Sequence, residues 1–230
     1  MSFPNATSID SDAFGYCSSL TTASFPNATS IGSYAFRSCT NLTTVSFPNV
    51  NSISEQVFYY CSKLAIASFP VATSIGASAF YMCSSLTTAS FPAVTSIGTY
   101  AFYRCSSLTT LSFPVVTSID PDAFENCSKL TSVSFPAVTS IGSNAFAYCS
   151  NLTMVSFPVA TSIGTYAFRN CSSLTNIYFT GSSIPTLANS NAFSRIATSY
   201  RIYIAESLYS KYIVANQWST ISSHITSYIS

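Results

Sequence analysis

Residues 25–46 read FPNATSIGSYAFRSCTNLTTVS, and the pieces of this stretch recur along the chain at an interval of 22 residues. Cysteine keeps this interval from Cys17 to Cys171, and leucine keeps it from Leu20 to Leu174. An unbroken series of short units of one length is typical of a solenoid, in which each unit packs only on its neighbours. The Phe-Pro pairs that mark the eight units begin at Phe3, Phe25, Phe47, Phe69, Phe91, Phe113, Phe135 and Phe157.

Each unit contains a segment that fits the Leu-x-x-Leu-x-Leu strand of leucine-rich repeats, such as the segment LTTVSF at residues 42–47. The alternation in this segment predicts a short strand with Val45 and Phe47 turned inward and Ser46 outward. The proline that follows cannot donate to a strand ladder and ends the pairing. A second short extended piece is expected near Ile31, with its side chain also inward.

A short helical segment is predicted after Ile31. The position of Gly32 is held by Asp, Ser or Gly in the eight units, and these residues are preferred at a helix N-cap. Residues 33–39 are therefore expected to form one to two helical turns, with Ala35, Phe36 and Cys39 facing the core.

The fold class predicted from these units is an α/β repeat, a right-handed leucine-rich-repeat solenoid of short strands and short helical turns. Eight coils at a strand spacing of roughly 5 Å make a curved rod about 40 Å long. Residues 1–178 hold the eight 22-residue repeats, and residues 179–230 are predicted to be a degenerate repeat and a C-terminal cap. Within the cap, Trp218, Ile221, Ile225 and Ile229 are expected to form an apolar stripe.

The composition excludes several classes of function. Charged residues make up 7% of the chain and the formal net charge is +1, so the chain has no field that would attract nucleic acid or an anionic membrane. Ser and Thr interrupt every apolar run, so membrane insertion is not expected. The first ten residues lack the basic and apolar regions of a signal peptide.

No catalytic, cofactor or metal site is predicted. The cysteines fall 22 residues apart without a Cys-x-x-Cys pair, so we interpret all eight as free thiols packed in the core. A few disulfides between repeats are the alternative. His224 is the single histidine, and no motif places a nucleophile beside it. Asp120, Asp122 and Glu125 could hold calcium, but acidic residues at a helix N-terminus are the simpler explanation. We therefore expect no enzyme activity.

The repeat and the tail together resemble a known family. The unit FPxxTSIGxxAFxxCSxLTxxS is similar to that of BspA-like leucine-rich repeat proteins, and the tail RIYIAESLYSKYIVANQWSTISSHI resembles the cap that follows such arrays in bacterial members. The resemblance implies an extracellular or cell-surface adhesion protein that binds a protein or glycan ligand. Components of the host extracellular matrix are among the ligands that it implies. Free core cysteines are more typical of a reducing compartment, which leaves a cytoplasmic location open.

Comparison of the eight units with one another shows where they vary. Variable positions flank the Ala-Phe pair of each unit, on the predicted helical turn, and are expected on the convex edge. Tyr, Arg, Asn and Ser gather there, as they do in adaptable binding surfaces. The alternative is that the tyrosines only cover the seam between neighbouring coils. The candidate binding residues are Tyr34, Arg37, Tyr59, Tyr60, Tyr81, Tyr100, Tyr103, Arg104, Tyr148, Tyr166 and Arg169.

A second candidate surface is the concave strand face, whose outward positions carry Thr and Ser and form an uncharged hydroxyl array. The array could accept a glycan or an extended peptide, although a solvated strand needs polar residues in any case. The function predicted overall is a non-catalytic binding or adhesion module. The alternative is a self-assembling structural protein that stacks through residues 1–3 into an end-to-end homodimer.

Overall fold

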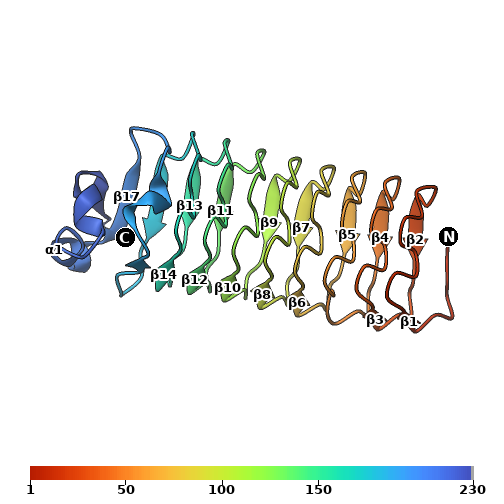
Figure 1. The fold of residues 1–230 in the computed structure, drawn as a ribbon. Helices are drawn as coiled ribbons and strands as arrows, with labels where there is room; N and C mark the ends of the chain where they lie inside the picture. The colour runs from red at the N-terminus through yellow and green to blue at the C-terminus, as the bar shows by residue number, and fades with distance from the viewer. Residues whose placement is uncertain (229–230) are drawn as a thin grey trace.

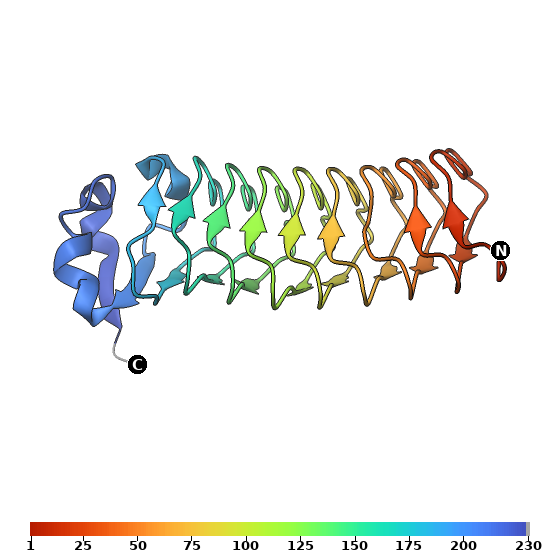
Figure 2. The same ribbon diagram turned by 90° about the horizontal axis from the view of Figure 1, so that it is seen from below.

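The computed structural model describes residues 1–228, which form one elongated solenoid (Figure 1). The coils follow one another in a nearly straight row from the N-terminus to the helical cap, as both ribbon views show (Figures 1 and 2). The predicted solenoid is confirmed, but the curvature is slight, so neither long face is deeply concave.

The longer strands of successive coils line one side of the stack and form the long-strand sheet. They pair in parallel with a register of one coil, so that Val45 lies beside Ala23 and Ala67. Val45 is buried while Thr44 and Ser46 are exposed, as the alternation predicts. The strands are β2 (Thr22–Ser24), β4 (Thr44–Ser46), β5 (Ile66–Ser68), β7 (Thr88–Ser90), β9 (Thr110–Ser112), β11 (Ser132–Ser134), β13 (Met154–Ser156), β15 (Asn176–Phe179), β17 (Arg201–Ala205) and β18 (Ile225–Tyr228).

Two-residue strands pair in parallel along another side of the stack, where they form a two-stranded and a six-stranded sheet. Each places its apolar residue inward, and Ile119 pairs with Ile97 and Ile141. The second extended piece predicted near Ile31 is therefore confirmed. The strands are β1 (Ser8–Ile9), β3 (Ser30–Ile31), β6 (Ser74–Ile75), β8 (Ser96–Ile97), β10 (Ser118–Ile119), β12 (Ser140–Ile141), β14 (Ser162–Ile163) and β16 (Thr186–Leu187).

The helical turns predicted over residues 33–39 are wrong, because this segment is a run of tight turns without a helix. The amides of Phe36 and Ser38 donate to Val57 O (2.9 Å) and Tyr59 O (2.6 Å) in the next coil, while that of Cys39 donates to Phe36 O three residues back (3.2 Å). Ser38 has a φ of 57°, which an α-helix does not allow. Hydrogen bonds between coils thus replace those of a helix. The residues predicted to face inward are nevertheless fully buried.

The core consists of stacked columns of one residue type. Phe102 lies between Phe80 and Phe124 with ring centroids 5.1 and 5.2 Å apart, and its side chain is fully buried. Seven cysteines are also buried, and each thiol donates to a phenylalanine carbonyl 25 residues earlier at 3.0–3.3 Å. The prediction that all eight cysteines lie in the core is wrong for Cys17, which is exposed in the first coil.

The chain keeps its coiled path beyond residue 178. This coil contains three more residues than the regular 22, and they form a loop. Thr186 Oγ1 accordingly donates to Thr161 O (3.1 Å) at a separation of 25 residues. The short η1 (Ser190–Phe193) then returns Phe193 to its column, where it stacks on Phe168 at 5.6 Å. The last coil is closed by η2 (Glu206–Leu208), α1 (Tyr209–Tyr212) and η3 (Trp218–His224).

Trp218 anchors this cap. Its side chain is buried, and Nε1 donates to Pro185 O at 2.8 Å. Its ring lies against Phe179 and Tyr212. The cap predicted from the sequence also includes Ile229, which lies outside the described residues. Within residues 1–228, none of the helices is long and apolar enough to cross a membrane.

The long-strand sheet is interrupted twice. Its strands form one group of β2, β4 and β5, a second of β7 and β9, and a third from β11 to β18. Across the first seam (β5/β7) and the second seam (β9/β11), the amides of Thr87 and Thr131 make no backbone hydrogen bond to the described residues, whereas the equivalent Thr109 donates to Thr87 O at 2.9 Å. The turn segments on the other side of the stack stay bonded throughout.

Candidate functional site

The turn face is defined here as the surface over residues 32–39 and the equivalent segments of the other coils. All eleven residues that the sequence singles out lie on it. Because successive turns are bonded at one-coil spacing, a side chain at one position of the repeat lies directly beside its equivalent in the next coil. The structure brings the eleven residues together as three groups along the rod.

The central group is a ladder of tyrosines. Tyr59 and Tyr103 stack on the two sides of Tyr81, with ring centroids 4.7 and 4.8 Å away and interplanar angles of 17° and 15°. Tyr60 packs edge-on against Tyr59 at 4.7 Å, and Tyr100 packs edge-on against Tyr103 at 5.6 Å. Tyr60 and Tyr100 are each 39% exposed, so the ladder carries a broad amphipathic surface.

The hydroxyls of Tyr59, Tyr81 and Tyr100 stay protonated at neutral pH, because the surroundings of each raise its pKa. Partial burial away from water raises the pKa of Tyr59 and Tyr81, and the neighbouring tyrosines raise it further. The Asp122 carboxylate raises the pKa of Tyr100. Protonated phenols donate and accept hydrogen bonds, so the ladder offers both kinds of group to a ligand.

The first group lies toward the N-terminus, around Arg37. Its guanidinium carbon lies 4.7 Å from the ring centroid of Tyr16 and 5.3 Å from that of Tyr34, and Arg37 Nε lies 3.1 Å from Asp12 Oδ1. Tyr16 and Asp12 were missed as candidate site residues. The signal was available for Tyr16, which stands directly before a cysteine, as Tyr60 and Tyr148 do.

The third group lies toward the cap, where Arg169 covers the ring of Tyr166 at 4.9 Å. Tyr148, which is 41% exposed, belongs to the same group, because its backbone amide donates to Arg169 O at 2.8 Å. Arg104 joins the central group instead, since its guanidinium carbon lies 5.4 Å from the Tyr103 centroid. The eleven predicted residues are therefore one central cluster with a smaller Arg-Tyr pairing on each side.

Many of these side chains stand on backbone that favours glycine. Six of the eleven have φ between 56° and 63°, yet none of the positive-φ positions of the described chain is a glycine. The left-handed conformation costs a residue with a Cβ about 1–2 kcal/mol. The same conformation occurs at equivalent positions with smaller side chains, such as Ser38 and Ser78, so it belongs to the turn of every coil and these six positions add a large side chain to it. The six are Tyr34, Tyr60, Tyr100, Arg104, Tyr148 and Tyr166.

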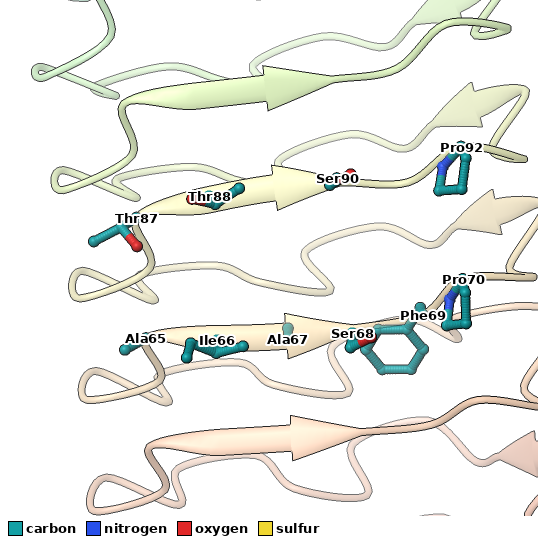
Figure 3. Close-up of a pocket in the computed structure, with 10 residues that line it drawn as sticks. All are labelled: Ala65, Ile66, Ala67, Ser68, Phe69, Pro70, Thr87, Thr88, Ser90 and Pro92. Atoms are coloured by element: carbon teal, nitrogen blue, oxygen red, sulfur yellow. The ribbon is translucent and has the colours of Figure 1, made fainter.

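The strand face, which is the outer surface of the long-strand sheet, carries the predicted array of Thr and Ser. A groove of about 530 Å³ lies on it at the first seam, where the side chains of β5 and β7 line the two sides (Figure 3). Ile66 is 58% exposed here, at a position that is Thr or Ser in the five other coils before Met154. The hydroxyl array is therefore broken at the seam by an apolar side chain.

A tyrosine cluster that the sequence did not indicate closes the strand face near the cap. Tyr178 stacks on Tyr203 with ring centroids 4.7 Å apart, and Tyr228 packs edge-on against Tyr178 at 6.2 Å. Tyr203 and Tyr228 lie beyond the regular repeats, where the 22-residue spacing no longer shows which residues are neighbours.

The groups considered for chemistry are held by structural contacts. His224 stacks on Tyr200 at 3.8 Å, and its Nδ1 lies 3.1 Å from Tyr200 O. Asp122 and Glu125 lie on a turn and not at a helix N-terminus, so the helix explanation for the acidic residues is wrong. Among residues 1–228, His, Cys, Asp and Glu form no cluster of three that could hold a metal ion.

Comparison with known proteins adds the family. The family model described as the BspA type leucine rich repeat region, with six copies, matches residues 1–108 and again residues 73–199. A leucine-rich repeat protein of T. pallidum is 29% identical, with a TM-score of 0.61 over 66% of this chain and 77% of that one. The pneumococcal vaccine antigen PcpA is 15% identical and shares the fold, with a TM-score of 0.57 over 96% of this chain and 69% of that one. No curated protein matches.

Proposed function

Since this chain belongs to the BspA-type leucine-rich repeat family, we propose that it is a non-catalytic binding module that recognises a protein ligand through the turn face. Leucine-rich repeat proteins are in general binding scaffolds without catalytic activity, and the comparisons indicate no enzyme family. The observation that carries the proposal is the central ladder, in which Tyr59, Tyr81 and Tyr103 stack in register and Tyr60 and Tyr100 add exposed rings.

The composition and rigidity of the ladder support this function. Tyr and Arg are the residues that contribute most at protein interfaces, because they bury a large area at a low cost in side-chain entropy. Stacking on both sides holds Tyr81 in place before any ligand arrives, which reduces the ordering cost of binding. A surface that served only to cover the joints between coils would not need bulky side chains on left-handed backbone.

A protein ligand fits the ladder better than a glycan. A sugar ring packs against the open face of an aromatic ring, whereas the faces of Tyr81 are covered by its two neighbours. The rings present their edges and hydroxyls, which suit peptide groups and polar side chains. Adhesion at a cell surface, with extracellular matrix proteins among the ligands, is the biological setting that the family suggests for this binding.

The test is a screen of the purified chain on protein and glycan microarrays, followed by affinity measurements on each hit. Tyr81→Ala and Tyr103→Ala are expected to weaken a bound protein at least about tenfold, as loss of a central tyrosine does at other interfaces. Thr110→Ala and Ser112→Ala change the strand face and are the matched controls, with no loss expected. Hits confined to glycans, or a loss of affinity in the strand-face variants and not in the tyrosine variants, would contradict the proposal.

A further inference from the structure

A shallow groove of about 320 Å³ runs beside the central ladder on the turn face. It is built from two positions of the repeat in three successive coils. One position directly precedes each cysteine, and the other directly follows it. The lining residues are Met82, Ser84, Arg104, Ser106, Asn126 and Ser128.

Arg104 is the one charged residue that lines this groove. The side chain of Arg104 is exposed. Within residues 1–228 a single ion pair forms, and it joins Arg37 to Asp12. The guanidinium of Arg104 therefore has no carboxylate at salt-bridge distance in the described chain. Asp122 and Glu125 lie in the neighbouring turn, but neither lines the groove.

The backbone and the neighbouring polar groups hold the groove in a fixed form. Arg104 and Asn126 have φ of 56° and 63°, so both side chains leave left-handed backbone. Asn126 Nδ2 donates to Glu125 Oε1 at 3.2 Å, and Ser84 Oγ donates to Ser62 O at 3.2 Å. The guanidinium, the remaining amide hydrogen of Asn126 and the hydroxyl of Ser106 are left as donors, a combination suited to a carboxylate.

We propose that this groove binds a carboxylate side chain, Asp or Glu, of the protein that the turn face recognises. The inference rests on the proposed function, because the groove adjoins the ladder through Tyr81 and Tyr103. Arg binds a carboxylate through two parallel hydrogen bonds, which gives direction as well as attraction. The groove thus selects for an acidic residue in the partner at a fixed distance from the tyrosine ladder.

The probe for this test is N-acetyl-glutamate N-methylamide, with the glutamine analogue as its neutral match, titrated into labelled protein and followed by NMR. The glutamate probe is expected to shift the Arg104 Nε–H signal saturably, and the glutamine probe is not. Arg104→Gln should abolish binding, read at the Asn126 side-chain signal. Arg195→Gln is the matched control, because Arg195 is an exposed arginine on left-handed backbone (φ 57°) that does not line the groove, so the shifts should stay unchanged.

Equal shifts from both probes, or equal loss of binding in the Arg195 variant, would overturn the groove as a carboxylate site. The outcome is separate from that of the proposed function, because the small probe does not depend on the tyrosines. If the glutamate probe binds at Arg104 but Tyr81→Ala leaves the affinity for the protein ligand unchanged, the groove proposal is supported and the ladder proposal is wrong. If the tyrosine variants lose the protein ligand but Arg104→Gln leaves its affinity unchanged, the ladder proposal is supported and the groove proposal is wrong.

Discussion

At the scale of single residues, the turn face combines an unfavourable backbone with large side chains. Tyr60 has a φ of 60°, and its neighbour Tyr59, with the same side chain, has no positive φ. Both rings belong to the same cluster, with centroids 4.7 Å apart. The pair therefore separates the energetic cost of the backbone from the contribution of the ring.

Replacement of Tyr60 by Gly and by Ala measures that cost directly. Both variants lose the ring, but Gly adopts left-handed backbone without strain. The Gly variant is expected to be more stable than the Ala variant by about 0.5–1 kcal/mol, after the greater flexibility of unfolded Gly is counted. At Tyr59 the order should reverse. Urea unfolding of the four variants provides the measurement, and the same order at both positions would contradict the strain argument.

A second residue-scale property is the pH dependence of stability at Glu125. Partial burial away from water raises the pKa of Glu125 from 4.5 to about 7. Asp122 contributes to this rise through a hydrogen bond and through the negative charge of its carboxylate. The folded chain thus holds a proton that the unfolded chain releases, so the free energy of unfolding is expected to fall as pH rises through this interval. Because the side chain is partly exposed, the change should be about 1 kcal/mol or less.

Urea unfolding at about pH 5 and about pH 8 tests this expectation. Glu125→Gln should reduce the difference in the free energy of unfolding between the two pH values. Glu55→Gln, an exposed carboxylate on the same face, is the control and should leave the difference unchanged. An unaltered difference in the Glu125 variant would show that other groups cause it.

At the scale of elements, the two seams divide the long-strand sheet into three groups although the stack is continuous. The inward residue of the strand before each seam, Ala67 in β5 or Leu111 in β9, is partly exposed, whereas Val45 in β4, which is paired on both sides, is buried. The turn segments remain bonded opposite the first seam, where the amide of Phe80 donates to Ala101 O at 2.8 Å. The two coils at each seam are thus held together without the backbone hydrogen bonds that join the other long strands.

Hydrogen exchange tests the seams with internal controls. The amides of Thr87 and Thr131 have no backbone acceptor among residues 1–228 and should exchange much faster than those of Thr109 and Thr153, which donate at 2.9 and 2.8 Å in the same position of the repeat. All four threonines stand in equivalent sequence surroundings, so the comparison needs no variant. Equal protection of the four amides would show that the sheet is continuous in solution.

At the scale of the whole molecule, stability depends on neighbour contacts that repeat along one axis. The buried thiols report on this stack. Burial raises the pKa of Cys171 to about 12, so its reactive thiolate is scarce while the coils are closed. Seven cysteines are buried in this column, among them Cys39, whose pKa is lowered by a hydrogen bond with Cys61, and Cys17 is exposed.

Titration with a thiol reagent is expected to find one fast cysteine and seven slow ones in the native chain, and eight fast ones after unfolding. Cys17→Ser should remove the fast reaction and leave the slow ones. More than one fast thiol in the native chain would show that the column opens readily. The loss of thiols in pairs would reveal disulfides, the alternative that the sequence left open.

The end-to-end homodimer also belongs to this scale and stays a prediction, since the structure describes a single chain. Light scattering across a wide concentration range measures it directly. A mass that rises with concentration would support assembly through the first coil, and a constant monomer mass would rule against it.

The amino-acid sequence by itself determined the solenoid, the register of its strands and the inward residues, because a 22-residue period places equivalent side chains in one column. It also indicated the turn face, since positions that vary among equivalent units are not required for packing. The predicted helix failed for a physical reason. Short-range capping signals such as Gly32 favour a helix, but hydrogen bonds to the next coil satisfy the same amides.

Only the tertiary structure decided how the surface residues are grouped. Tyr16 joins Arg37, and Tyr203 joins Tyr178, because coils lie side by side in space where the sequence spacing is long or irregular. The seams were likewise not predictable, since the inward residues on both sides keep the repeat pattern. The groove at Arg104 depends on three coils at once. Local periodicity specifies which residues are buried, whereas contacts between coils specify which exposed residues meet.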